Sequence, residues 1–432
     1  MLNREDADFP LLAPQLRTWA AQSDDLSNPV YCICDYLDIR GPVDPVLMSS
    51  AHEFVEEEAE ALRLAVITVE GEHRQFLRDK TTPLELLDLS AESAPAAAAT
   101  AWMESDARRP VDPDQLCTSA LVKVADDHFI LYRRVHHAVV DGYSLALIFN
   151  RTAAVYTALA HGLPPGGSGF PPYTHLLEAD AAYRDSKSFA RDREHWQRKM
   201  AGRPEPVSLA GRAGGLAIGR RRTAELAPDA VGRLQRAADD LGVTWSDLAV
   251  SAMAAYVART TGARELLLGL PTGGRLSPQV RNVPGMTMNI LPLRLSVDTA
   301  TPLGDFAKEV SREIREVLLH SRYPTAEISR ELAEKGDGAR LWGPMVNVMR
   351  FDYALDFAGA HAVLRTVSLP LTVDLTVYFF QTSADGATDV MLDAHPELYS
   401  PAETAGHMEG ILSLLRALET AGPRTAVGDI GG

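Results

Sequence analysis

The sequence has few cysteines, and this scarcity excludes one class of protein at once. Only Cys32, Cys34 and Cys117 occur among 432 residues. A domain held together by a disulfide framework would need more cysteines at many spacings. We therefore expect three reduced thiols and a cytoplasmic protein.

Positive charge and long apolar runs are also lacking. Lys and Arg total 42 against 58 Asp and Glu, so the formal net charge is −16. Nucleic acids and anionic membranes attract basic surfaces, so neither is expected as a partner. No stretch approaches the roughly 18 apolar residues of a membrane-spanning helix. Residues 1–8 lack the apolar core of a signal peptide.

Length and composition fit a protein of several structural units. Hydrophobic residues make up 46% of the chain and charged residues 23%, which is ordinary for a globular protein. At roughly 150 residues per domain, the length favours about three domains or two large lobes. Residues 163–172 are rich in Pro and Gly and form the clearest linker. We predict an N-terminal lobe over 1–168 and a C-terminal lobe over 169–432.

Both halves mix helical and strand-like patterns, which predicts an α/β fold in two similar lobes. In the first half, strands are expected at 116–124 and 128–135 around a turn at Asp126-Asp127. Helices are expected at 43–62 and 143–160. Residues 91–100 are biased in composition, and their structure is left open. The second half predicts helices at 228–241, 246–260, 302–320 and 401–418, and strands at 266–270, 290–297 and 373–380.

The most informative segment joins a predicted strand to a predicted helix. It contains His136, His137, Asp141 and Gly142 in the order HHAVVDG. Adjacent strand residues point to opposite faces, so one imidazole should pack inside and the other should face a cleft. We favour His137 for chemistry because it lies at the very end of the strand. A neutral imidazole can accept a proton near pH 7.

Three other interpretations of this segment stay open on the residues alone. The histidines could both be packed, with Asp141 capping the helix. His137 and Asp141 are four residues apart and could bind a metal, although no third ligand recurs nearby. Gly142-Tyr143-Ser144-Leu145-Ala146 lies where a serine nucleophile elbow would lie, but it ends in Ala instead of Gly.

The HHAVVDG segment matches the HHxxxDG signature of nonribosomal peptide synthetase condensation domains. Other stretches resemble motifs of this family in the same order along the chain: 13–19, 60–63, 183–204, 284–289, 320–324 and 343–353. The sequence departs from the family pattern at Glu58-Ala59, where Arg-His is common, and at Ser321, where Gln is usual.

The resemblance implies an α/β chloramphenicol-acetyltransferase-like fold, with two lobes in a V and a tunnel at their interface. It implies acyl transfer from a carrier-protein thioester to an amine or alcohol acceptor, giving an amide or an ester. The partners would be peptidyl or acyl carrier proteins and a small-molecule acceptor. No permanently bound cofactor and no metal are expected, since the phosphopantetheine arm of the carrier tethers the substrate.

Site residues follow from the resemblance residue by residue. His137 corresponds to the catalytic histidine and His136 to a packed one. Asp141 corresponds to a structural aspartate, expected to pair with Arg275 of the other lobe. The backbone N–H of Gly142 would face the developing oxyanion. Three further residues are candidates for the substrate tunnel: Tyr143, Asn289 and Asn347.

Alternatives to a carrier-dependent condensation enzyme are a coenzyme A-dependent O-acyltransferase of the same superfamily and a non-catalytic module that recruits carriers or other partners. We find no adenylate-forming loop and no phosphopantetheine attachment serine, so the chain is not expected to activate or carry its own substrate. A free-standing enzyme and an excised synthetase domain would look alike in this sequence. Basic residues at 220–222 and within 191–199 are candidates for carrier docking, although solvated faces explain them as well.

Overall fold

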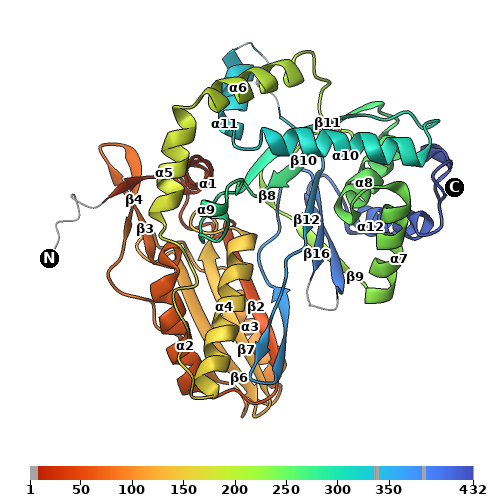
Figure 1. Cartoon of the computed structure of the whole chain (residues 1–432). Coiled ribbons are helices and arrows are strands. Elements are labelled where there is room, and N and C mark those ends of the chain that lie inside the picture. Colours follow the sequence, from red (N-terminus) through yellow and green to blue (C-terminus); the bar gives the residue numbers. More distant parts are fainter. Residues whose placement is uncertain (1–7, 335, 337–339, 382–385, 432) are drawn as a thin grey trace.

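The computed structural model describes residues 8–334, 336, 340–381 and 386–431. Two six-stranded sheets form the centres of two lobes that lie side by side (Figure 1). Each lobe has its own cluster of buried apolar side chains. This mixed α/β architecture agrees with the predicted fold class.

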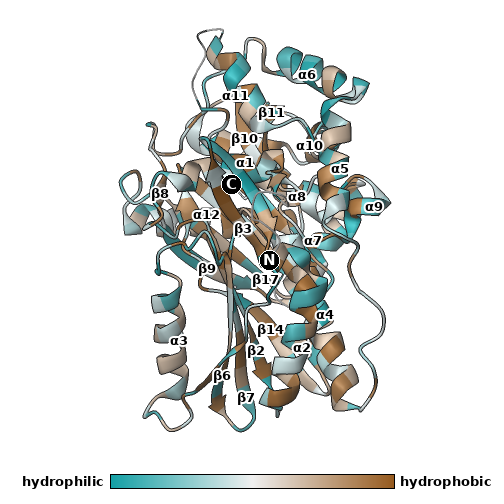
Figure 2. Ribbon diagram, turned by 90° about the vertical axis from the view of Figure 1, so that its left-hand side faces the viewer, coloured by the Kyte–Doolittle hydropathy of each residue, from teal (hydrophilic) through white to brown (hydrophobic). Residues whose placement is uncertain are grey.

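The sheet of the first lobe combines strands from both halves of the chain. Helices α2 (Pro45–Glu58) and α4 (Gly142–Ala160) lie on one side of it, and α3 (Pro95–Asp106) lies on the other (Figure 2). The strand order is β13 (Asp356–Phe357), β14 (Ala360–Thr366), β2 (Cys32–Arg40), β7 (His128–His136), β6 (Cys117–Ala125) and β5 (Glu85–Asp88).

The C-terminal half contributes β13 and β14 to this first sheet. β14 pairs antiparallel with β2, in a register that joins His361 to Arg40 and Thr366 to Asp35. Phe357 and Leu364 are buried in the core of the first lobe, which explains why the segment crosses over. The predicted lobe boundary at residue 168 stays a prediction. Residues 356–366 lie beyond that boundary in the chain, but they belong to the sheet of the first lobe.

The second lobe has a mixed sheet covered by helices. Helix α8 (Trp245–Thr261) is buried along most of its length. The other helices are α7 (Pro228–Leu241), α10 (Leu303–Leu319) and α12 (Pro401–Leu418). The strand order is β11 (Asn289–Ser296), β10 (Glu265–Thr272), β12 (Met345–Met349), β16 (Leu375–Gln381), β17 (Thr388–Ala394) and β9 (Arg220–Leu226).

Two helices carry the chain from the first lobe to the second (Figure 1). α5 (Thr174–Arg184) places Leu176 in the first core, and α6 (Lys187–Met200) places Trp196 in the second. The remaining elements are α1 (Ala13–Ser23), α9 (Pro278–Arg281), α11 (Thr325–Glu334), η1 (Glu60–Arg63), η2 (Val427–Asp429), β1 (Phe9–Pro10), β3 (Leu64–Val69), β4 (Glu72–Leu77), β8 (Ala217–Ile218) and β15 (Leu371–Thr372).

Most predicted elements occur close to their expected bounds, and one helix is shorter than predicted. The predicted helix over 43–62 begins at Pro45, because the side chain of Asp44 caps it, and ends at Glu58 before η1. Residues 95–100 of the open segment 91–100 form the first turns of α3. Among the described residues, no single helix has the length and hydropathy to cross a membrane; the bent pair α7–α8 meets that test by length and composition only.

Candidate active site

The connection between β7 and α4 places His137 in the wall of a cavity. β7 ends at His136 and α4 begins at Gly142, so His137 lies just beyond the strand. Its backbone N–H donates to the carbonyl of Tyr31 at 2.8 Å, which continues the pairing of β7 with β2. The cavity has a volume of about 320 Å³ and is lined by residues of both lobes, including Met288. The imidazole therefore borders the space between the lobes.

Burial sets the protonation state of His137. Removal from water holds the pKa of the ring below its ordinary value of 6.5, and the charge of Asp141 offsets this effect only in part. The ring atom Nδ1 is buried and makes no hydrogen bond with any described residue. The ring is consequently neutral at pH 7 and keeps a lone pair that can accept a proton.

His136 lies on the opposite face and is fully engaged in packing. Its Nδ1 accepts a hydrogen bond from the backbone of Ala138 at 3.0 Å, and its Nε2 lies 3.3 Å from the side-chain oxygen of Gln22. Trp19 contacts the ring edge-on, with 5.3 Å between centroids. Burial lowers the pKa of His136 to about 3. The two adjacent histidines therefore have separate environments, as strand geometry predicts.

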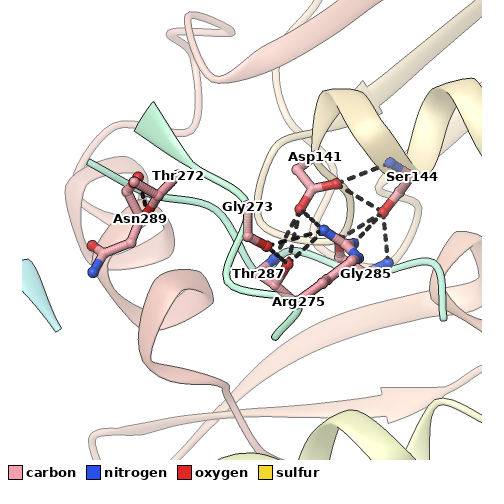
Figure 3. Close-up of polar contacts among 8 residues, drawn as sticks. All are labelled: Asp141, Ser144, Thr272, Gly273, Arg275, Gly285, Thr287 and Asn289. Atoms are coloured by element: carbon pink, nitrogen blue, oxygen red, sulfur yellow. Dashed lines mark hydrogen bonds and ion pairs between the residues drawn. The ribbon is translucent and has the colours of Figure 1, made fainter. Parts of the chain in front are cut away.

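Asp141 holds the two lobes together through Arg275 (Figure 3). An Nη1 nitrogen of Arg275 lies 2.7 Å from Oδ2 of Asp141, and the side chains are 6% and 3% exposed. The backbone N–H of Thr287 donates to the same carboxylate oxygen at 3.1 Å. Although burial opposes ionisation, Arg275 and these hydrogen bonds hold the pKa of Asp141 below its usual range. The ion pair expected from the resemblance is present.

The other carboxylate oxygen of Asp141 caps α4. Oδ1 accepts from the backbone N–H of Ser144 at 2.9 Å. The Ser144 hydroxyl is fully buried and lies within 2.9 Å of both Oδ1 and the backbone N–H of Gly285 (Figure 3). The Ser144 hydroxyl therefore contacts buried groups, and Ser144 is not among the residues that line the cavity. The geometry does not support Ser144 as a nucleophile or Asp141 as a metal ligand, because the Ser144 hydroxyl and both carboxylate oxygens of Asp141 are already hydrogen-bonded within the protein.

Gly142 lies in the cavity wall at the first position of α4. A Cβ added there would lie 3.7 Å from Phe351 and 3.8 Å from Met349. The first N–H groups of a helix have no intrahelical acceptor. The backbone N–H of Gly142 is therefore available to a ligand, and no side chain at this position projects into the cavity.

The three tunnel candidates lie in different surroundings. Asn347 of β12 lines the His137 cavity. Asn289 lines a second cavity, but its amide donates to the carbonyls of Ser321 and Tyr323 at 3.1 and 2.8 Å. Tyr143 lies against Arg275, with its ring 5.1 Å from the guanidinium, and is not among the residues that line either cavity.

The second cavity meets the first at Arg17 and Met286, which line both. Its volume is about 340 Å³. Sequence reasoning did not single out Arg17, whose guanidinium makes no ion pair with any described residue. Burial lowers the pKa of Arg17, partly offset by Tyr31. The signal in the sequence is its place in the stretch 13–19 that resembles a family motif, beside Thr18 and Trp19, which are buried on α1.

No group of three or more His, Cys, Asp or Glu side chains lies close enough to hold a metal ion within the part of the chain that the structure describes.

Comparison with known proteins defines the class to which this arrangement belongs. The sequence model of the condensation domain matches residues 5–419. The first condensation domain of the calcium-dependent antibiotic synthetase, solved with a substrate analogue, is 30% identical, with a TM-score of 0.90 over 98% of this chain and 99% of that one. A mutant starter condensation domain of rhizomide synthetase, solved with C8-CoA, is 33% identical, with a TM-score of 0.90 over 99% and 98%.

Two curated relatives agree with the structural neighbours. The chain is 35% identical to the dimodular nonribosomal peptide synthase of Bacillus subtilis, over 100% of this chain and 18% of that protein. It is 38% identical to the isonitrile lipopeptide synthase of Streptomyces coeruleorubidus, over 98% of this chain and 29% of that protein. The chain belongs to the condensation-domain family of nonribosomal peptide synthesis, an acyltransferase family that forms amide bonds. It spans less than a third of the length of these relatives.

Proposed function

We propose that this chain joins an acyl group, delivered as the thioester of a carrier protein, to an amine acceptor. The observation that carries the proposal is the neutral imidazole of His137 in the wall of an interlobe cavity. A second cavity opens from the first at Arg17, so that each reactant has a separate approach. The phosphopantetheine arm of the carrier is the tether, and no resident cofactor is required.

The reaction is an attack of the amine nitrogen on the thioester carbonyl. The C–N bond forms, the carbonyl oxygen gains negative charge, and the C–S bond then breaks to release the thiol. The N–H of Gly142 stabilises the oxyanion, because it projects from the N-terminus of α4 at the cavity wall. His137 orients the amine and takes the proton that the nitrogen sheds, and this proton finally reaches the sulfur.

An alcohol acceptor would place a greater demand on His137. A hydroxyl is a poor nucleophile until its proton leaves, whereas a neutral amine attacks readily. Removal of the proton by a positioned base contributes roughly 10²–10⁴ in rate. We propose that an ester product is the second outcome of the same site, with a coenzyme A thioester as the alternative donor.

The carrier partner is part of the proposal, but two of the three arginines at 220–222 are not free for docking. Arg221 forms a bidentate pair with Asp393, at 2.8 and 2.7 Å. Arg220 donates to the carbonyls of Pro396 and Tyr399. In α6, Arg193 is paired with Glu331. These contacts favour a structural role for much of the basic surface.

The test is incubation of the protein with acyl-loaded carrier proteins and a panel of amines and alcohols, with products identified by mass spectrometry. An amide product that requires His137 is the expected result. Asn347→Ala is the matched variant in the same cavity wall, and we expect it to change substrate preference without abolishing turnover. Products formed at the same rate by a folded His137→Ala protein would refute the proposal.

A further inference from the structure

Several ionisable residues besides His137 line its cavity, and one of them, Asp35, lies at a distance from the histidine. Asp35 lies in β2, is 8% exposed and is one of the residues that line the cavity. Its Oδ1 accepts a hydrogen bond of 3.4 Å from the hydroxyl of Ser368. Within the described residues, no Lys, Arg or His forms an ion pair with it. A carboxylate in this position has no role in the reaction proposed above.

Strand geometry gives the position of Asp35 relative to the reacting centre. His137 is joined by a backbone hydrogen bond to Tyr31, which directly precedes β2, and Asp35 in β2 follows Tyr31 by four residues. Residues two apart on a strand share a face, so Tyr31, Ile33 and Asp35 are on one side. A rise of about 3.3 Å per residue places the backbone of Asp35 about 13 Å along the strand from the level of His137. Both ends of this path border the same cavity.

The cation whose charge acts on Asp35 is already paired. Arg221 lies at the same end of the cavity, but its Nε and Nη2 donate to the carboxylate oxygens of Asp393 and its Nη1 donates to the carbonyl of Ser368. When Asp35 is ionised, its negative charge is consequently not balanced by an ion pair with any described residue. Its burial raises its pKa to about 6, and hydrogen bonding from Thr366 and Ser368 and the charge of Arg221 offset the effect only in part.

The rest of this end of the cavity is mainly apolar and aromatic. Tyr353, Leu364, Phe380 and Met391 belong to its wall. An alkyl chain would be well accommodated by these side chains, but a chain that ends in a methyl group would leave the carboxylate buried without a cation to pair with. A buried ionic group is costly unless it is paired and hydrogen-bonded. A cationic hydrogen-bond donor on the substrate would restore the charge balance.

We propose that Asp35 selects acyl donors that carry a protonated amine, held about 13 Å along the chain from the thioester carbonyl. This inference rests on the proposed function, because it assigns specificity to the acyl group that His137 processes. Discrimination follows from the unpaired charge, since a site built to pair with a donor group rejects the analogue that lacks it. Asp35 touches the substrate and determines specificity, without a part in bond formation.

The test measures binding and turnover separately. Three acyl pantetheine probes of about eight to ten carbons match the path length and differ only at the far end, which is ammonium, hydroxyl or methyl. Amide-linked versions resist transfer and report Kd by calorimetry, while thioester versions report kcat/KM with an amine acceptor. The proteins are the wild type, Asp35→Asn and Asp38→Asn. Asp38 is the matched control because it lies on the same strand but outside the cavity wall.

We expect the wild type and Asp38→Asn to bind the ammonium probe roughly tenfold or more tightly than the methyl probe, as a charged hydrogen bond implies. In Asp35→Asn this preference should disappear, with binding of the methyl probe preserved or improved. Equal Kd values for the ammonium and methyl probes in the wild type, equal binding of the hydroxyl and ammonium probes, or an unchanged preference in Asp35→Asn would each overturn the inference. A preserved binding preference without turnover of any thioester would instead refute the proposed function.

Discussion

The interlobe ion pair makes a strong prediction about stability. Replacing Arg275 by Met removes the only cation that pairs with Asp141 among the described residues, while the carboxylate stays buried at 3% exposure. Breaking a buried pair from one side costs about 3–5 kcal/mol. Thr287 and Ser144 continue to donate to the carboxylate, so the loss should lie toward the lower end of that range. Asp141→Ala should be similarly destabilising, because it leaves the guanidinium buried and also removes the cap of α4.

The assay is urea unfolding followed by intrinsic fluorescence, with amide hydrogen exchange across 283–289 as a local measure of lobe contact. The control is Arg330→Met in the exposed pair with Glu334, which should change little because solvent screens that pair. The double replacement of Asp141 and Arg275 should cost less than the sum of the single ones. A well-folded Arg275→Met protein with unchanged unfolding and exchange would show that the reasoning about this pair is wrong.

Four further outcomes follow from the site. His137→Ala should impair ester formation more than amide formation in paired acceptor assays, and equal losses would count against a base whose importance depends on the nucleophile. Because burial holds the pKa of His137 below 6.5, kcat/KM with an alcohol acceptor, which does not ionise in this range, should stay level down to that pH and fall only at lower pH; a decline that begins above pH 7 would contradict this. Ser144→Ala should lower thermal stability while the folded fraction keeps its activity, and a folded inactive protein would restore the nucleophile interpretation. Gly142→Ala should fold normally but raise KM, because its Cβ would lie 3.7 Å from Phe351 in the cavity, and an unchanged KM would argue against substrate passing there.

Local chemistry made much of the fold predictable. α7 has Pro228 at its first turn and Gly242 just past its end, where the backbone adopts a φ of +72° that favours glycine. The turn at Asp126-Asp127 separates two strands that pair along nearly their whole length. These elements depend on neighbours within a few residues. The pairing of β14 with β2 depends on residues more than 300 positions apart, and no local pattern specifies it.

The predictability of the site residues also depends on whether the information is local or long-range. Alternation along a strand was enough to separate His136 from His137, since the two faces of a sheet are fixed by backbone geometry. The resemblance supplied Arg275 as a partner for Asp141, because its motif carries information about contacts between distant residues. Asp35 had neither source of information: it is one acidic residue in an ordinary strand, and its significance comes from what surrounds it.

The chemical character of an ionisable side chain in this protein is decided by which elements enclose it. Asp35 and Asp141 are both buried carboxylates in the same lobe, yet the pKa of one rises and that of the other falls. The difference is that Arg275 reaches Asp141 from the opposite lobe, whereas Arg221, the cation facing Asp35, is paired with Asp393. One carboxylate is therefore satisfied by the protein and fixes the lobes, and the other is left to be satisfied by what enters the cavity. Asp393→Asn would free Arg221 to pair with Asp35, so we expect it to weaken binding of the ammonium probe without loss of the methyl probe. Unchanged Kd values for both probes in a folded Asp393→Asn protein would show that Arg221 does not govern the charge at that end of the cavity.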